Sequence, residues 1–271
     1  MGIIRLSNKE LRWLVITNLL AAVLHTGICV TVAVIGDLAL QPPLYGVDIA
    51  YAGGSGVGVP SITTFGTFPI TMIVVVYPAV TAFFHFGNAL IWPKFYFDML
   101  ERCQNPMRWA EYTVTASLMT TVISFLTGVR TTLLLTALAM LVASTILCGY
   151  STEQVNRPSS PFVWDNPSYR SRVRNTLLGF LPYSAEWAIT IVTIVKLTNC
   201  RNAYIIAILA AEFALWCVFP LIQLVQFYRP PKDFVYGEFA FIFMSLTAKA
   251  VLAIVALAAG YLSEGAEFCK P

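Results

Sequence analysis

Charged residues are scarce in this sequence. Only 11% of its 271 residues are Asp, Glu, Lys or Arg, and 58% are hydrophobic, whereas charged residues make up about 25% of a typical soluble domain. The net charge of +3 is spread between apolar segments, so we expect no nucleic-acid partner. The composition indicates a protein embedded in lipid. Since a spanning helix needs roughly 20 apolar residues, the length suits about seven helices in a single domain, residues 1–271.

Motifs for catalysis and metal binding are also missing. The two histidines, His25 and His85, lie in apolar segments, and the six cysteines include no CxxC pair. The chain shows no catalytic triad, metal-ligand spacing or phosphate loop, so we expect neither an enzyme nor a metal site. Cys200 and Cys269 fall on the same expected face of the membrane, where an oxidising environment would allow a disulfide. The alternative is that they are small packing residues.

Seven apolar segments have the length of a membrane-spanning helix. They cover residues 11–35, 68–91, 109–129, 131–150, 177–195, 204–227 and 239–262. Two connections are long. Residues 37–66 contain a glycine-rich run and short alternating apolar pieces, which predict a β-hairpin, and residues 151–175 contain three prolines and several arginines, which predict a polar loop. We therefore expect an all-α bundle of seven transmembrane helices with a small hairpin or sheet in the first loop.

The basic residues predict the orientation of this bundle, because Lys and Arg accumulate in cytoplasmic loops. Of the 17 basic residues, 12 lie on the side of the N-terminus, four lie on the other side, and Lys249 lies inside the last segment. This asymmetry places the N-terminus and the 151–175 loop in the cytoplasm, and the C-terminus and the 37–66 loop outside. G-protein-coupled receptors and ion-pumping microbial rhodopsins have the opposite orientation.

A few ionisable residues lie within the apolar segments. A charge at the bilayer centre costs at least about 2.5–3.5 kcal/mol, so such residues face the bundle interior and mark functional sites. Lys249 is the only charged residue of the segment 239–262, and a buried amine is favoured in its neutral, nucleophilic form, which can bind an aldehyde as a Schiff base. A plain ion pair with a buried glutamate is the alternative. The remaining residues of this kind are His25, His85, Glu111, Glu186 and Glu212, with Arg108 at a helix start.

Three of these residues, Arg108, Glu111 and Lys249, belong to two short sequence motifs. Residues 108–112 read Arg, Trp, Ala, Glu, Tyr, which resembles the arginine, aromatic, alanine, acid, aromatic pattern of microbial rhodopsins. Residues 245–249 resemble the segment that carries their retinal-binding lysine. Ser245 replaces the aspartate usual in pumps, and Val122 lies where outward proton pumps hold a carboxylic donor. Glu111 is then the single counterion expected for Lys249.

These motifs, the two intramembrane histidines, the long first loop and the cytoplasmic N-terminus together resemble the heliorhodopsin family over all seven helices. The resemblance implies all-trans retinal bound covalently to Lys249, with Glu111 as counterion and Ser245 hydrogen-bonded near the Schiff base. It also implies internal proton movement through a polar region that contains His25 and His85. The 37–66 loop is implied to form a sheet over the outer face and to support a homodimer.

Residues 216–220 add a pattern of aromatic, two residues, aromatic, proline that lines the retinal ring in microbial rhodopsins. An aromatic stripe is more often plain packing, but beside the two motifs it favours a pocket. The predicted pocket residues are Trp216, Phe219 and Pro220, with Thr115 and Met119 on the helix of Glu111.

Three functions are compatible with this sequence. The first is a photoreceptor that passes its signal to a cytoplasmic partner, which the missing proton donor favours. The second is light-driven or light-gated proton transport, for which Glu186 and Glu212 supply further carboxylates. The alternative for both residues, which their burial favours, is a protonated, hydrogen-bonded acid that ties helices together. The third is a solute transporter without chromophore, in which Glu186, Glu212 and Lys249 bind substrate.

Overall fold

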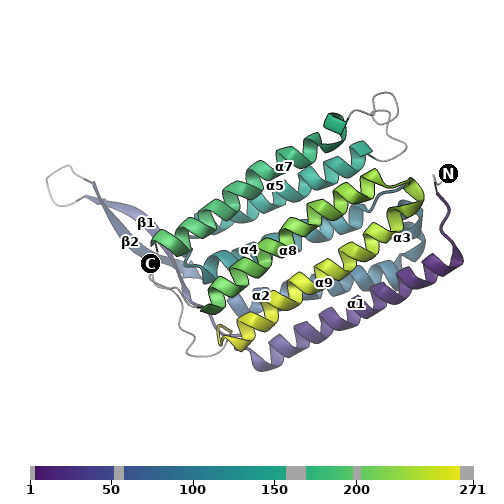
Figure 1. Cartoon of the computed structure of the whole chain (residues 1–271). Helices are drawn as coiled ribbons and strands as arrows, with labels where there is room; N and C mark the ends of the chain where they lie inside the picture. Colours follow the sequence, from purple (N-terminus) through teal and green to yellow (C-terminus); the bar gives the residue numbers. More distant parts are fainter. Residues whose placement is uncertain (1–3, 52–57, 157–168, 198–202, 263–271) are drawn as a thin grey trace.

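In the part of the chain that the structure describes, seven long helices form one elongated bundle. The computed structural model describes residues 4–51, 58–156, 169–197 and 203–262 (Figure 1). Each predicted apolar segment overlaps one long helix. These helices are α1 (Asn8–Ile35), α2 (Ile70–Phe86, continued by a π-helical turn, Gly87–Ile91), α4 (Pro106–Leu126), α5 (Thr132–Asn156), α7 (Tyr169–Val192, continued by a π-helical turn, Thr193–Leu197), α8 (Ala203–Tyr228) and α9 (Phe234–Ala258).

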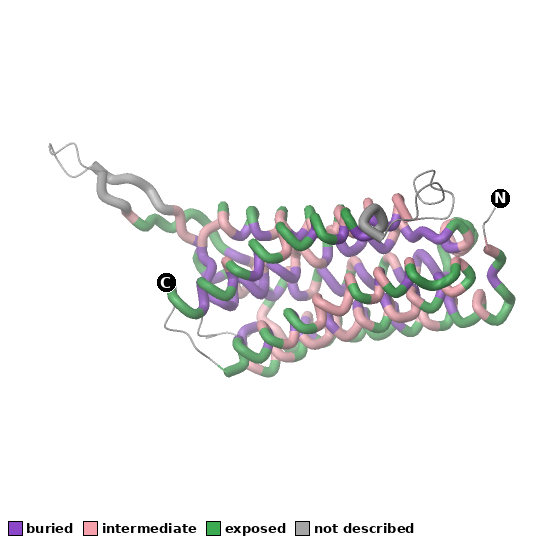
Figure 2. The backbone as a smooth tube through the Cα atoms, turned by 45° about the horizontal axis from the view of Figure 1, so that its top comes forward, coloured by how far each residue is buried: buried purple, intermediate pink, exposed green. Residues whose placement is uncertain are grey.

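The helices pack as a closed ring. Helix α1 contacts α2 and α9, α2 contacts α4, α4 contacts α5, α5 contacts α7, α7 contacts α8, and α8 contacts α9. Buried residues line the inside of the bundle, and exposed residues lie along its outer surface (Figure 2). Much of that outer surface is apolar, as Leu20, Leu133 and Phe243 show, which suits contact with lipid tails.

Among the described residues, six helical segments are long and apolar enough to cross a membrane. They are Asn8–Ile35, Ile70–Ile91, Thr132–Asn156, Val173–Lys196, Ala203–Tyr228 and Pro231–Ala258. Helix α4 is absent from this set, because it carries Arg108, Glu111 and many hydroxyl side chains. It contacts α2, α5 and α8, and its polar residues are mostly buried, so the protein itself surrounds much of this helix.

Local sequence signals explain where several helices begin. Ser7 and Glu10 form a capping box at the start of α1, in which the side chain of each accepts from the backbone N–H of the other. Asn105 caps α4 by accepting from the backbone N–H of Arg108 at 3.1 Å, and Pro106 occupies the first turn.

A short helix, α3 (Pro93–Leu100), follows α2 and was not among the predicted segments. Its Tyr96 and Leu100 belong to a small hydrophobic cluster at the N-terminal end of the bundle.

The predicted hairpin is present in the first long connection. Strands β1 (Pro43–Tyr51) and β2 (Gly58–Thr67) pair antiparallel, with an irregularity in register between Leu44 and Tyr45. The hairpin projects from the end of the bundle opposite the N-terminus (Figure 1). Its base is fixed to the turn between α4 and α5, because the backbone N–H of Tyr45 donates to the carbonyl of Arg130 at 2.8 Å.

The second long connection is shorter than the predicted loop 151–175. Helix α5 continues to Asn156, and α7 begins at Tyr169. The polar residues Thr152 and Glu153 are completely buried rather than solvated, which explains why the helix extends past the apolar segment. Residues 157–168 lie outside the described residues, as do Cys200 and Cys269 of the disulfide considered above.

Candidate functional site

Lys249 lies in the interior of the bundle, in the middle of α9. Its side chain is buried, and its Nζ lies 3.0 Å from Glu111 Oε1 on α4 and 2.6 Å from Ser245 Oγ. Ser245 precedes Lys249 by one helical turn, so the two side chains share a face of α9. The structure therefore brings together the three residues that the sequence motifs linked.

Two threonines complete the surroundings of Glu111. Thr81 of α2 donates to Glu111 Oε1 at 2.6 Å, and Thr115 donates to the same oxygen at 3.2 Å. Thr115 is a predicted site residue, whereas Thr81 is not, because a single hydroxyl in an apolar helix gives no recognisable signal. Buried ion pairs persist only where further hydrogen bonds satisfy the charges, and these donors supply them.

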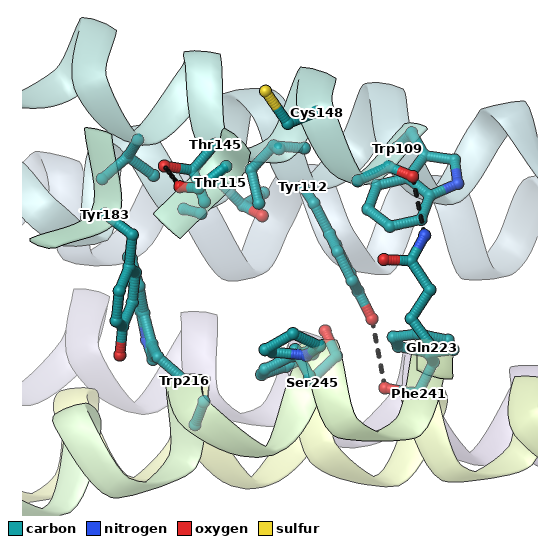
Figure 3. Close-up of a pocket in the computed structure, with 18 of the residues that line it drawn as sticks. Trp109, Tyr112, Thr115, Thr145, Cys148, Tyr183, Trp216, Gln223, Phe241 and Ser245 are labelled. Atoms are coloured by element: carbon teal, nitrogen blue, oxygen red, sulfur yellow. Dashed lines mark hydrogen bonds between the residues drawn. The ribbon is translucent and has the colours of Figure 1, made fainter. Parts of the chain in front are cut away.

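A mostly apolar cavity with a volume of about 120 Å³ opens beside Lys249. Its walls come from α4, α5, α7, α8 and α9. Figure 3 shows Tyr112 within it, donating from its hydroxyl to the carbonyl of Phe241 at 3.1 Å. All the pocket residues predicted from the sequence lie in this lining: Thr115, Met119, Trp216, Phe219, Pro220 and Ser245.

Other residues of the cavity were not predicted. Gly149 of α5 is required by close packing, because a Cβ there would lie 2.5 Å from the indole ring of Trp109. Its carbonyl accepts from Gln223 Nε2 of α8 at 2.6 Å (Figure 3). Gly179 of α7 would meet Cys148 of α5 at 3.0 Å in the same way. Glycines of this kind can be recognised only once the helix neighbours are known.

The two histidines lie together between α1 and α2. Their rings are stacked with centroids 5.7 Å apart, and His85 Nδ1 lies 2.8 Å from Asn18 Oδ1. Both residues are buried, and among the described residues neither ring nitrogen of His25 has a hydrogen-bond partner. The geometry is compatible with the predicted polar region, while the role of that region stays a prediction.

Arg108 forms a buried cluster with two glutamates that the sequence analysis missed. Its guanidinium is bonded to Glu153 of α5 and Glu238 of α9. The side chain of Asn105 donates to Glu238 Oε2 at 2.7 Å, and its backbone N–H donates to Glu153 Oε1 at 2.7 Å. Gln226 of α8 donates to Glu238 Oε1 at 3.2 Å. We call these five residues the arginine cluster.

Glu186 and Glu212 lie elsewhere, where α7 packs against α8. Both are buried, and Glu212 Oε2 accepts from Trp216 Nε1 at 3.0 Å. One carboxylate oxygen of each, Oε2 of Glu186 and Oε1 of Glu212, has no hydrogen-bond partner among the described residues. Within the described ranges no hydrogen bond or ion pair joins either carboxylate to Arg108 or Lys249, and the proton network stays a prediction. The same ranges hold no group of three or more His, Cys, Asp or Glu that could bind a metal ion.

Comparison with known proteins gives one family and one fold. A family model described as Heliorhodopsin matches residues 14–260. The crystal structure of cyanorhodopsin N4075R from the cyanobacterium Tolypothrix sp. NIES-4075 resembles this structure with a TM-score of 0.54 and 12% sequence identity, over 94% of this chain and 97% of that chain. At this identity the likeness concerns the fold alone. The chain matches no curated protein.

Proposed function

Because this chain belongs to the heliorhodopsin family, we propose that it is a light-absorbing retinal protein that holds all-trans retinal on Lys249. The observation that carries the proposal is a buried lysine whose Nζ contacts Glu111 and Ser245 beside a mostly apolar cavity. Such a lysine can form a Schiff base with the aldehyde of retinal. Bound retinal would supply the absorption of visible light and the photoisomerisation.

The residues of the site have separate tasks in this proposal. Glu111 compensates the positive charge at Lys249 Nζ. After light absorption, Glu111 accepts the proton that Nζ holds. Thr81 and Thr115 orient the Glu111 carboxylate, and Ser245 contacts Nζ from the other side. The walls of the cavity hold the polyene and exclude water through Trp216, Phe219, Pro220 and Met119.

We propose signalling rather than pumping as the outcome. Val122, at the position where outward pumps hold a proton donor, is completely buried in apolar surroundings. We also propose that the N-terminus is cytoplasmic, as the distribution of Lys and Arg indicates. A signalling partner would then meet the end of the bundle that holds the arginine cluster, while the projecting hairpin would lie outside and support a homodimer.

Proton transport is a second candidate, and one observation favours it. Glu186 and Glu212 are buried, and one carboxylate oxygen of each has no hydrogen-bond partner within the described part of the chain; buried carboxyl groups of this kind can take part in proton relays. In a transporter, Glu186→Gln and Glu212→Gln would abolish a light-induced current measured in membranes of cells supplied with retinal. In a sensor there is no such current to lose, and both variants keep their visible absorption.

The proposed function is tested by the absorption spectrum of protein expressed with all-trans retinal. We expect a visible band in the wild type, none in Lys249→Ala, and a band with altered position or pH dependence in Glu111→Gln. Lys232→Ala, which changes an exposed lysine outside the bundle core, is the matched control and keeps the wild-type band. Folded wild-type protein without a visible band would contradict the proposal and return Lys249, Glu186 and Glu212 to a substrate-binding transporter.

A further inference from the structure

The arginine cluster carries one more negative charge than positive. Arg108, Glu153 and Glu238 are all buried, with exposed fractions of 6%, 0% and 1%, and one guanidinium faces two carboxylates. The amides of Asn105 and Gln226 contribute hydrogen bonds but no charge. An unbalanced charge is costly in a low-dielectric interior, so uptake of one proton would make the cluster neutral and relieve that cost.

The two glutamates differ in what they can reach. Glu238 lines a small cavity whose walls also include Glu111, Asn18 and His85, whereas Glu153 is not part of this lining. The cavity has a volume of about 20 Å³, which is room for about one ordered water molecule. Glu238 and Glu111 are therefore two carboxylates at the wall of one polar space.

This space continues the polar contacts of Lys249 toward the N-terminal end of the bundle. Lys249, Thr81 and Thr115 all contact the same oxygen of Glu111, and Glu111 also lines the small cavity. Glu238 precedes Ser245 by seven residues in α9, which corresponds to a rise of about 10 Å along the helix. A proton that leaves Glu111 in this direction meets Glu238 before it reaches the end of the bundle.

Glu153 shares Arg108 with Glu238 but does not line the cavity, and two other titratable groups near Glu238 are poor acceptors. Burial raises the pKa of the Cys103 thiol to about 12, and burial likewise raises the pKa of Tyr96, so both already hold their protons at neutral pH. Arg108 carries its full complement of protons in the ion pairs. His85 remains as the competing acceptor at the cavity wall, and the experiment below distinguishes it from a carboxylate.

We propose that Glu238 is a proton-accepting site on the N-terminal side of Lys249. The proposal rests on the proposed function, because the proton concerned is the one held at Lys249 Nζ. That proton moves first to the Glu111 carboxylate. The O–H bond on Glu111 then breaks, the proton crosses the small cavity through water, and an O–H bond forms on Glu238. Glu111 is again a carboxylate, and the arginine cluster becomes neutral.

Protonation of Glu238 also has a structural consequence. A neutral carboxyl attracts the Arg108 guanidinium much less than a carboxylate does, so the connection between α4 and α9 weakens at this end of the bundle. The proton transfer is thereby linked to a loosening of helix contacts at the end where we propose that a partner binds.

The proposal is tested by light-induced infrared difference spectra of retinal-loaded protein. In the wild type we expect a new absorption of a protonated carboxyl group after illumination. Glu238→Gln should lose it, and Glu238→Asp should retain it at a shifted frequency. Glu101→Gln is the matched control, because Glu101 lies at the same end of the bundle, accepts from the backbone N–H of Leu6 at 3.2 Å, and does not line the cavity. Its spectrum should be that of the wild type.

A carboxyl band that is unchanged in both Glu238 variants would overturn the proposal, as would a wild-type spectrum that shows histidine protonation and no carboxyl band. Glu238→Asp decides the question if Glu238→Gln does not fold.

Retinal-free protein provides a second measurement. Acidified in the dark, it should show a carboxyl band that Glu238→Asp shifts, and an unshifted spectrum would again overturn the proposal. If loaded wild-type protein has no visible absorption, the proposed function fails, while the retinal-free titration still decides whether Glu238 accepts a proton.

Discussion

At the scale of single residues, Thr81 determines how the negative charge of Glu111 is distributed. Its hydroxyl donates to Glu111 Oε1 at 2.6 Å, the same oxygen that lies 3.0 Å from Lys249 Nζ. A hydrogen bond to a charged group is worth about 1.5–3 kcal/mol. Thr81 is thus a positioning residue that acts on Lys249 through Glu111.

We expect Thr81→Val to lower the free energy of unfolding by about 1–3 kcal/mol and to move the visible band to shorter wavelength. The shift follows because loss of the donor concentrates negative charge beside Lys249 Nζ. Thr113→Val is the control, since the Thr113 hydroxyl bonds only to the carbonyl of Trp109, at 2.8 Å. Denaturant titration and absorption spectra measure both effects, and an unshifted band in Thr81→Val would contradict this assignment.

The two residues that contact Lys249 Nζ, Glu111 and Ser245, were among those predicted from the sequence, whereas Thr81 and most of the arginine cluster were not. Glu111 and Ser245 were predictable because they lie in short motifs with fixed spacing to Arg108 and Lys249. Glu153 and Glu238 were missed because the expected segments ended at residue 150 and began at residue 239. Arg108 lies 45 residues from one glutamate and 130 from the other, so only the packing of α4, α5 and α9 brings them together.

At the scale of helices, the sequence predicts which segments are helical better than it predicts where they end. All seven apolar segments overlap long helices, because a helix in lipid satisfies its own backbone hydrogen bonds. The end of α5 was predicted too early, because Thr152 and Glu153 look like loop residues. They are helical and buried because Glu153 pairs with Arg108, and because Thr176 of α7 donates to Thr152 Oγ1 at 3.2 Å.

At the scale of the whole molecule, the hairpin is the feature that points to assembly. On β2, Ile62 and Phe65 are 67% and 71% exposed, and Phe65 lies at the irregularity in the pairing with β1. Apolar side chains exposed on a projection from the bundle indicate contact with another protein surface. A second copy of the chain is the partner that we propose.

We therefore expect the double substitution Ile62→Ser and Phe65→Ser to convert the protein from dimer to monomer. Light scattering of the detergent-solubilised protein measures the mass, after correction for bound detergent. Leu133→Ser removes another exposed apolar side chain, at the start of α5, and should leave the mass unchanged. A dimer that survives the double substitution would exclude the hairpin as its main contact.

The arginine cluster also has a consequence for how the protein is made. Helix α4 leaves the ribosome with Arg108 uncompensated, since Glu153 follows 45 residues later and Glu238 follows 130 residues later, and among the long helices that the structure describes α4 alone lies outside the six apolar spans. It is therefore poorly suited to enter lipid on its own. We expect α4 to remain at the insertion machinery until α5 and α9 have been synthesised. The last step of membrane insertion would then take place only after the whole chain has been made.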